Sequence, residues 1–364
     1  MNPQTLRELM SGSRRGAGAA VLRALLSAAS VPYAAVTRLR RWAHRARLLP
    51  SDSLAKYSRP GSGHPVRVIS VGNITAGGTG KTPMAAWMVH RLKHMQVRPA
   101  VLTRGYKSAG GVSDEAELLR TLCPDTPVVV NPDRFAGAQQ AMGQGAEAMV
   151  LDDGFQHLRL RRDLDIVLID ATDPFGYGRC LPRGLLREPL SALRDADAIV
   201  ITRSDLVGRA QLDDLRSRLA RLAPKASVHL AVHKATHLID EGGAAKPVEE
   251  LAGRPAFAFC GIGNPAGFFA ALEALGASLS GRVVLDDHVS YSAELVGRLG
   301  RQARDCGAEL AVTTQKDAVK LKDAELGLPI WQLAVEMEFV EGEAELVEKI
   351  RRLCAAHERH RDGE

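Results

Sequence analysis

A glycine-rich turn between an apolar run and a helical pattern constrains the fold of this chain more than any other feature. Residues 66–72, "VRVISVG", are typical of a buried strand, and residues 82–95 predict a helix. Between them, "NITAGGTGKT" matches the phosphate-binding pattern G-x-x-x-x-G-K-[ST] except at its first glycine, where the chain has Thr75. A strand, a glycine loop and a helix in this order predict a nucleotide-phosphate site in an α/β fold.

The loop keeps the chemistry that the pattern requires. Glycines allow the peptide N–H groups to turn toward phosphate oxygens, and the following helix adds its dipole. We expect Lys81 to reach the β- and γ-phosphates and the Thr82 hydroxyl to bind Mg²⁺. Thr75 is compatible with this role if its position does not need a positive φ. The predicted phosphate-binding residues are Thr75, Ala76, Gly77, Gly78, Thr79, Gly80, Lys81 and Thr82.

Apolar runs alternate with helical patterns along most of the chain. Such runs stand at 66–72, 99–105, 127–131, 148–154, 165–170 and 197–203, and a second series begins after about residue 250. This alternation predicts an α/β fold, a P-loop NTPase-type parallel sheet with helices on both faces, plus a smaller C-terminal α/β lobe. The expected ranges are an N-terminal helical segment (1–60), a P-loop core (61–237), a connector (238–255) and a C-terminal lobe (256–364).

A pair of acids follows the strand predicted at 148–151. A P-loop needs a second metal anchor at the end of a neighbouring strand, and Asp152 and Asp153 in "VLDDG" fit that need. Two adjacent carboxylates repel each other unless a cation lies near them. Asp170, which ends "DIVLID", is the competing candidate.

Two further motifs have a weaker meaning. "ITRSD" (201–205) imitates the guanine-specifying [NT]-K-x-D with Arg203 in the lysine position, and we interpret it as a strand end followed by a turn. "GIGNPAGF" (261–268) has its third glycine one residue too late for a dinucleotide fingerprint, so we predict a tight strand-to-helix turn.

The N-terminus is strongly basic and partly apolar. Residues 1–60 hold eleven Arg and Lys against two acids, whereas the rest of the chain is mildly acidic, which disfavours a nucleic-acid partner. The apolar run 16–37 contains Arg23 and Pro32 and precedes "RLRRWAHRAR", so it fits neither a signal peptide nor a clean membrane span. An amphipathic helix at a membrane surface and an ordinary helix packed on its own domain both remain open. Five scattered cysteines without a C-x-x-C spacing favour reduced thiols in the cytoplasm.

Residues after the second strand offer groups for an acceptor substrate. "TRGYKSAGGVSDEAELL" contains Arg104, Tyr106, Asp114 and Glu115, and "VLDDHVSYS" places His288 in the C-terminal lobe. A carboxylate hydrogen-bonded to an imidazole is a general base suited to an alcohol. A base and a histidine on different lobes would couple catalysis to lobe closure. A histidine that only caps a helix is the alternative.

The motifs in combination resemble one family. In chain order they are "ISVGNITAGGTGKTP", "TRGYK", "SDE", "NPDR", "LDDGFQH", "LPRGLLREPL", "GIGNPAGFF", "DDHVSYS" and "TTQKDAVK". This series, from about residue 20 to 340, resembles the tetraacyldisaccharide 4′-kinases, the lipid A 4′-kinases of Gram-negative bacteria. The resemblance implies ATP and Mg²⁺, an acylated disaccharide 1-phosphate as lipid substrate, and a monotopic enzyme on the cytoplasmic face of the inner membrane. The charge distribution predicts no nucleic-acid partner, and no obligate protein partner is evident in the sequence.

The resemblance also assigns roles by position. Asp114 resembles the catalytic base, oriented by His288, and Arg187 in "LREPL" resembles a group that stabilises phosphoryl charge. Asp152 and Asp153 resemble the metal-binding acids. The expected substrate-side residues are Arg104, Tyr106, Glu115, Gln156 and His157. The chain departs from the family pattern at Ser113 and Ala116, which flank the two acids.

A second function class uses the same loop. A P-loop regulatory ATPase or GTPase of the MinD or metallochaperone type would act as a switch and would need no acceptor base. That class expects a loop lysine where this chain has Ala76, or a clean [NT]-K-x-D, which Arg203 alters. A kinase needs Asp114 and His288, and both are present.

Overall fold

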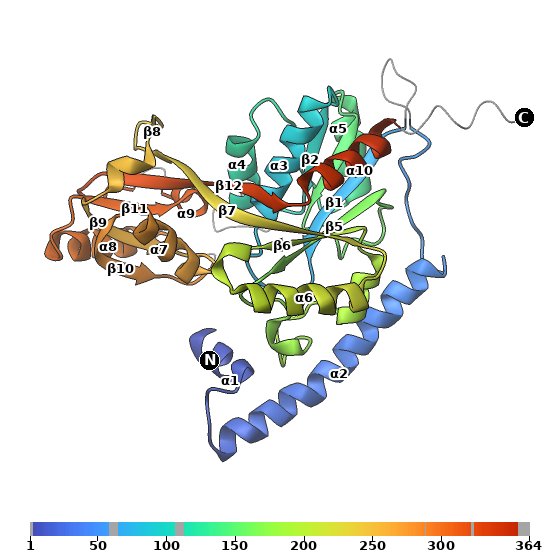
Figure 1. Ribbon diagram of the computed structural model, residues 1–364, viewed down its shortest axis with the longest axis horizontal. Helices are drawn as coiled ribbons and strands as arrows, with labels where there is room; N and C mark the ends of the chain where they lie inside the picture. Colours follow the sequence, from blue (N-terminus) through green and yellow to red (C-terminus); the bar gives the residue numbers. More distant parts are fainter. Residues whose placement is uncertain (1–2, 58–64, 106–112, 288, 322–323, 356–364) are drawn as a thin grey trace, which may run out of the picture. The chain divides into compact units, whose positions relative to one another are not determined.

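A parallel β-sheet carries the glycine loop in the first of two compact units (Figure 1). The computed structural model describes residues 3–57, 65–105, 113–287, 289–321 and 324–355. Across the sheet of this unit the order is β7 (Ser227–Ile239), β6 (Ala198–Thr202), β5 (Leu164–Asp170), β1 (Arg67–Asn73), β4 (Ala148–Asp152), β2 (Pro99–Thr103) and β3 (Val128–Val130). Neighbouring strands run parallel, as the continuous apolar runs predict.

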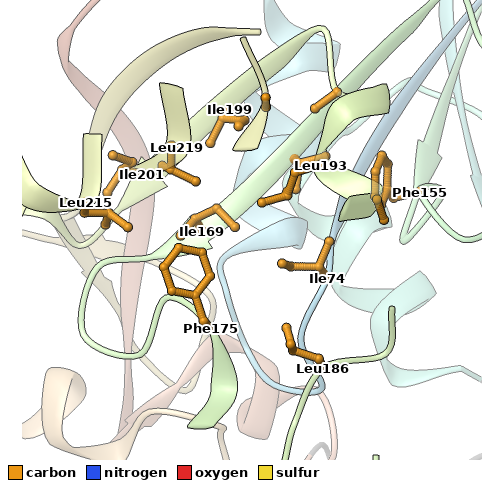
Figure 2. Packing of buried hydrophobic residues seen from close by; sticks show 14 of the residues in the cluster. Ile74, Phe155, Ile169, Phe175, Leu186, Leu193, Ile199, Ile201, Leu215 and Leu219 are labelled. Atoms are coloured by element: carbon orange, nitrogen blue, oxygen red, sulfur yellow. The ribbon is translucent and has the colours of Figure 1, made fainter. Parts of the chain in front are cut away.

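Helices cover both faces of this sheet. Helix α3 (Lys81–His94) packs on β1, β2 and β4, whereas α5 (Arg134–Gly143) packs on β2 and β3. Helix α6 (Arg209–Leu222) contributes Leu215 and Leu219 to a buried cluster with Ile169, Ile199 and Ile201, drawn in Figure 2. Burial of such side chains contributes about 1.5–3 kcal/mol each, so these layers fix the strands that carry the site.

Strand register brings the predicted residues to one edge of the sheet. Val71 of β1 lies opposite Asp152 of β4, so β4 ends two residues before β1, at the same edge of the sheet. The carboxyl ends of parallel strands form the usual ligand-binding edge of an α/β sheet.

Two N-terminal helices belong to the same unit. Helix α1 (Pro3–Ser11) precedes α2 (Ala17–Arg45), which continues through Pro32 and is long and apolar enough to cross a membrane by length and composition alone. Its exposed large apolar side chains are Val21, Leu22, Leu25, Val31, Val36, Leu39 and Trp42. The opposite side is anchored, because Arg41 is buried, pairs with Glu188 and Asp195, and lies 4.5 Å above the Phe155 ring.

The second compact unit combines residues 105–124 with 233–338. Its parallel strands follow the order β10 (Ser278–Val284), β9 (Pro255–Cys260), β11 (Leu310–Thr314) and β12 (Ile330–Glu341), and β8 (Ala245–Lys246) pairs antiparallel with β7. Helices α7 (Pro265–Ala274) and α8 (Ala293–Asp305) cover opposite faces of β9, because alternate residues of β9 belong to their two separate clusters. Helices α4 (Asp114–Leu122) and α9 (Gln315–Ala318) pack together in the same unit. Short 3₁₀ turns stand at Gly176–Gly178, Leu190–Asp195, Ser204–Leu206 and Val248–Leu251, and α10 (Glu343–Ala355) returns to the first unit.

The predicted fold class is confirmed: parallel sheets with helices on both faces, a smaller α/β lobe and an N-terminal amphipathic helix. The division into compact units differs from the four linear ranges expected above. The chain changes unit inside β7 and inside β12, and the segment 105–124 belongs with the later residues. A strand that serves two units carries no break in composition, so the sequence offers no signal for such a boundary.

Candidate active site

The phosphate loop follows β1 in the expected conformation. Gly80 adopts the left-handed region with φ 92° and immediately precedes α3, whose first residues are Lys81 and Thr82. A side chain would be strained there, which explains the glycine. A Cβ placed on Gly77 would meet no atom within 4 Å, so one side of the loop is open.

Thr75 resolves the departure from the standard pattern. It is absent from the residues with positive φ among those described, so it needs no glycine. Its backbone forms an antiparallel bridge with Leu186, and the neighbouring Ala76 donates its N–H to the Leu185 carbonyl at 2.7 Å. Arg187 donates its backbone N–H to the Ile74 carbonyl at 2.8 Å. The first half of the loop is therefore an extended segment supported by 185–187.

Side chains from β1 and from the end of β6 hold the carbonyl groups of the loop. The Thr202 hydroxyl donates to the Thr79 carbonyl at 3.0 Å, and the Arg203 guanidinium donates to the Gly78 carbonyl at 2.9 Å. The Asn73 amide donates to the Gly77 carbonyl at 3.3 Å. In a trans peptide the next N–H points opposite to the carbonyl. Bonds to these carbonyls therefore direct the N–H groups of the loop to the other side, where an anion can accept them.

The turn predicted at "ITRSD" is confirmed, and Arg203 in it also has a structural role that the motif does not predict. β6 ends at Thr202, and Arg203 adopts a left-handed φ of 54° before the 3₁₀ turn. Its guanidinium also pairs with Asp170. Asp170 also accepts two hydrogen bonds from Thr172, so it joins the Arg203 side chain to the turn after β5.

The two acids after β4 differ in their surroundings. Asp152 is buried at the end of the strand, whereas Asp153 has a left-handed φ of 54°. Asp153 accepts two hydrogen bonds from Arg187, at 2.7 and 2.9 Å, and its Oδ1 lies 3.7 Å from Lys81 Nζ. Burial acts to raise the pKa of Asp153, but Lys81 and Arg187 outweigh it and hold the pKa below its usual value. Asp153 is therefore an anion placed between two cations of the loop edge.

The residues after this acid pair support the loop. The Gln156 amide donates to the Asn73 carbonyl at 2.7 Å, so Gln156 fixes the end of β1. Burial, with Arg134, Arg162 and Arg40 nearby, lowers the pKa of His157 to about 4. His157 is consequently a neutral imidazole at pH 7.

Asp114 and Glu115 begin α4 in the second compact unit. Ser113, one of the departures from the family pattern, caps this helix by accepting the Ala116 N–H at 3.4 Å. Asp114 Oδ2 lies 3.7 Å from Lys320 Nζ. Asp114 was expected in the P-loop core, but the structure groups its segment, 105–124, with residues 233–338 in the second compact unit. Tyr106 and His288 lie outside the described residues, and Arg104 is an exposed residue after β2.

The structure thus brings together Thr75–Thr82, Asp152, Asp153, Gln156 and Arg187 in the first unit, and it places Asp114 and Glu115 in the second. The supporting residues Asn73, Thr202, Arg203 and Lys320 had no predicted role. Thr202 and Arg203 lie in the motif "ITRSD", and Lys320 ends the motif "TTQKDAVK", so these two motifs could have drawn attention to them.

Comparison with known proteins names the family. The family described as tetraacyldisaccharide-1-P 4′-kinase (LpxK) matches residues 22–355. A tetraacyldisaccharide 4′-kinase from Pelobacter propionicus is 40% identical over 337 residues, covering 86% of this chain and 88% of that protein. One from Geobacter sulfurreducens is 38% identical over 352 residues, covering 91% and 94%.

A solved structure agrees with these relatives. The LpxK of Aquifex aeolicus, crystallised in complex with ATP, is 28% identical, with a TM-score of 0.70 over 92% of this chain and 99% of that one. The alternative of a regulatory switch is therefore not supported. The phosphate loop, the acid pair beside it and the match over most of its length show that this chain belongs to the tetraacyldisaccharide 4′-kinase family.

Proposed function

We propose that this kinase transfers the γ-phosphate of ATP, bound with Mg²⁺, to the 4′-hydroxyl of a tetraacylated glucosamine disaccharide 1-phosphate. The product is the bisphosphorylated lipid A precursor. The observation that carries the proposal is the family match over residues 22–355, which includes the loop, the acid pair and the segments that hold Asp114 and His288.

The loop is suited to bind the phosphates of a nucleoside triphosphate. The carbonyl groups of Gly77, Gly78 and Thr79 are already bonded to protein donors, so the loop does not present them to an anion. Lys81 begins the helix that follows, where its charge and the helix dipole act on the same phosphates. These features support ATP as the phosphoryl donor.

Asp152, Asp153 and the Thr82 hydroxyl would hold Mg²⁺. Among the described residues there is no cluster of three or more His, Cys, Asp or Glu, and a magnesium site in a P-loop enzyme needs none. Mg²⁺ takes one or two carboxylates and completes its shell with water and phosphate oxygens. When bound, it supplies positive charge to the phosphoryl oxygens.

The remaining site residues would have separate roles in the phosphoryl transfer. Asp114, oriented by His288, would accept the proton of the 4′-hydroxyl as that oxygen attacks phosphorus. Lys81 and Arg187 would stabilise the charge spread over the transferred group. Both cations now share Asp153, so binding of a cation at this carboxylate would leave them free to turn to the phosphates. Arg104, Tyr106, Glu115 and His157 would contact the disaccharide side.

The exposed apolar side chains of α2 support a position at a membrane surface. Basic residues interleave with them, as in helices that lie in the interface of anionic lipid. The lipid substrate and the reduced cysteines are consistent with the cytoplasmic face of the inner membrane.

A direct assay tests the proposal. Purified protein is incubated with γ-labelled ATP and the tetraacyl disaccharide 1-phosphate in detergent micelles, and lipid products are separated by chromatography. We expect a labelled lipid with one more phosphate, and Lys81→Ala should lose it by orders of magnitude. Label released only as inorganic phosphate would refute the lipid acceptor. Full activity of Lys81→Ala would refute the role of the loop.

A further inference from the structure

The segment Thr313–Lys320, "TTQKDAVK", has no role in the scheme above, yet it is firmly anchored in the second unit. Asp317 is completely buried, and its Oδ2 accepts the Gly261 N–H at 2.9 Å and the Thr314 hydroxyl at 2.7 Å. Thr314 in turn accepts the Asp317 N–H at 3.1 Å and caps α9. The segment is therefore a rigid support that begins at the end of β11.

Two lysines project from this support toward acids from distant parts of the chain. Lys316 Nζ lies 2.7 Å from Asp287 Oδ1, and position 288 follows that residue directly. Lys320 Nζ lies 3.7 Å from Asp114 Oδ2, and the exposed fractions of these two side chains are 7% and 21%. One short segment thus contacts the acid assigned as base and the residue before the assigned histidine.

The Lys320 ammonium is placed for an electrostatic role. It is buried, and within the described part of the chain its Nζ donates no hydrogen bond. A buried charge without hydrogen bonds is costly, so this arrangement is poor as a means of stabilising the fold. The 3.7 Å separation exceeds a hydrogen bond. The lysine therefore attracts the Asp114 carboxylate without occupying the lone pairs that a base must offer to a hydroxyl proton.

We infer that Lys320 is a positioning residue for Asp114: its ammonium holds the carboxylate of the base in orientation from α9, with Lys316 supporting Asp287 on the same segment. This inference rests on the proposed function, in which Asp114 is the base. Lys320 contacts neither ATP nor the lipid in this scheme, so its loss acts through Asp114 alone.

Steady-state kinetics of the full-length enzyme test the inference. Lys320→Met removes the charge and keeps the length of the chain, and we expect kcat to fall about 10- to 100-fold, the range for a misplaced catalytic group. The KM for ATP should stay within about twofold, because the phosphate loop is untouched. Lys320→Arg should recover most of the lost rate. Lys246→Met is the matched control, since Lys246 lies 3.6 Å from Asp240, an acid without an assigned role; its kcat should be unchanged.

A double substitution separates the inference from the proposed function. If Lys320 acts through Asp114, adding Lys320→Met to Asp114→Asn should cost almost nothing further. Normal turnover of Asp114→Asn would overturn the base assignment and the inference with it. If Asp114→Asn is inactive but Lys320→Met keeps the kcat of the unmodified enzyme, the inference is overturned and the base assignment stands. A structural role would also overturn it, and would be recognised by a lower melting temperature of Lys320→Met, a raised KM for ATP and no rescue by arginine.

Discussion

Arg203 offers the sharpest test of how the phosphate loop is held. The substitution Arg203→Met removes the guanidinium that pairs with Asp170 and donates to the Gly78 carbonyl at 2.9 Å. Both side chains of the pair are only 11% exposed, so the variant leaves a largely buried carboxylate without its cation. Breaking a buried pair from one side typically costs 3–5 kcal/mol. Because Asp170 keeps two hydrogen bonds from Thr172, we expect the lower end, about 3 kcal/mol.

The same substitution releases the Gly78 carbonyl. A hydrogen bond from a charged donor contributes about 1.5–3 kcal/mol, and its loss lets the loop sample conformations that cannot bind phosphate. We therefore expect the KM for ATP to rise about tenfold or more. Turnover at saturating ATP should change less, because Arg203 does not face the transferred phosphate in the proposed scheme.

Urea unfolding followed by circular dichroism measures the free energy, and initial rates at varied ATP give the KM. Arg351→Met is the control, because Arg351 forms an exposed pair with Glu348 and its loss should cost less than 1 kcal/mol. Replacing Asp170 by Leu in the Arg203→Met background should restore part of the lost stability without restoring the KM. A loss below 1 kcal/mol in Arg203→Met, or an unchanged KM, would refute the reasoning.

Three further predictions use other parts of the structure. Gly72→Ala places a Cβ 2.6 Å from Phe155 Cβ and should destabilise the protein by about 1–3 kcal/mol in urea titrations, whereas Gly143→Ala, with no atom within 4 Å, should be neutral or stabilising. The pKa of His157 is about 4 in the folded protein and near 6.5 in the unfolded chain, so as the pH falls the imidazole is protonated in the unfolded chain before it is protonated in the folded protein. The free energy of unfolding should thus fall as the pH drops from 6.5 toward 4, and His157→Gln should flatten that slope; an identical slope in both would contradict the assignment. Leu25→Asp with Val36→Asp, at residues 62% and 64% exposed, should reduce co-sedimentation with anionic vesicles and leave the melting temperature unchanged; undiminished binding would place the membrane contact elsewhere.

The sequence predicts the phosphate loop because its requirements are local. A buried strand, glycines for the turn and a helix start at Lys81 lie within about twenty consecutive residues, and the structure has them in that order. Thr75 fits the loop without a positive φ, because a position in an extended segment tolerates a β-branched residue.

The supporting contacts could not be predicted in the same way. Arg203 and Gly78 are 125 residues apart, and the distance between them depends on strand order and register. The membership of 105–124 in the second unit has a similar cause, because it depends on the packing of α4 against α9. Tyr33 lies in the apolar N-terminal run, and its hydroxyl donates to the Arg187 carbonyl at 3.0 Å. An aromatic residue on an amphipathic helix suits either a lipid or a protein surface, and the sequence alone does not distinguish them.

The anchored side of α2 has a practical consequence for anyone who wants a water-soluble form of this kinase. Deleting residues 1–45 would remove Arg41. The buried Glu188 carboxylate would then lack that cation, and the ring of Phe155 would be exposed. Tyr33 and Ala34, which pack against the core cluster, would be lost as well. If such a truncated protein were inactive, the cause would be the loss of these core contacts, and the result would not show that the enzyme needs lipid. Exchanging the outward apolar residues for polar ones keeps every one of these contacts and is the sounder design.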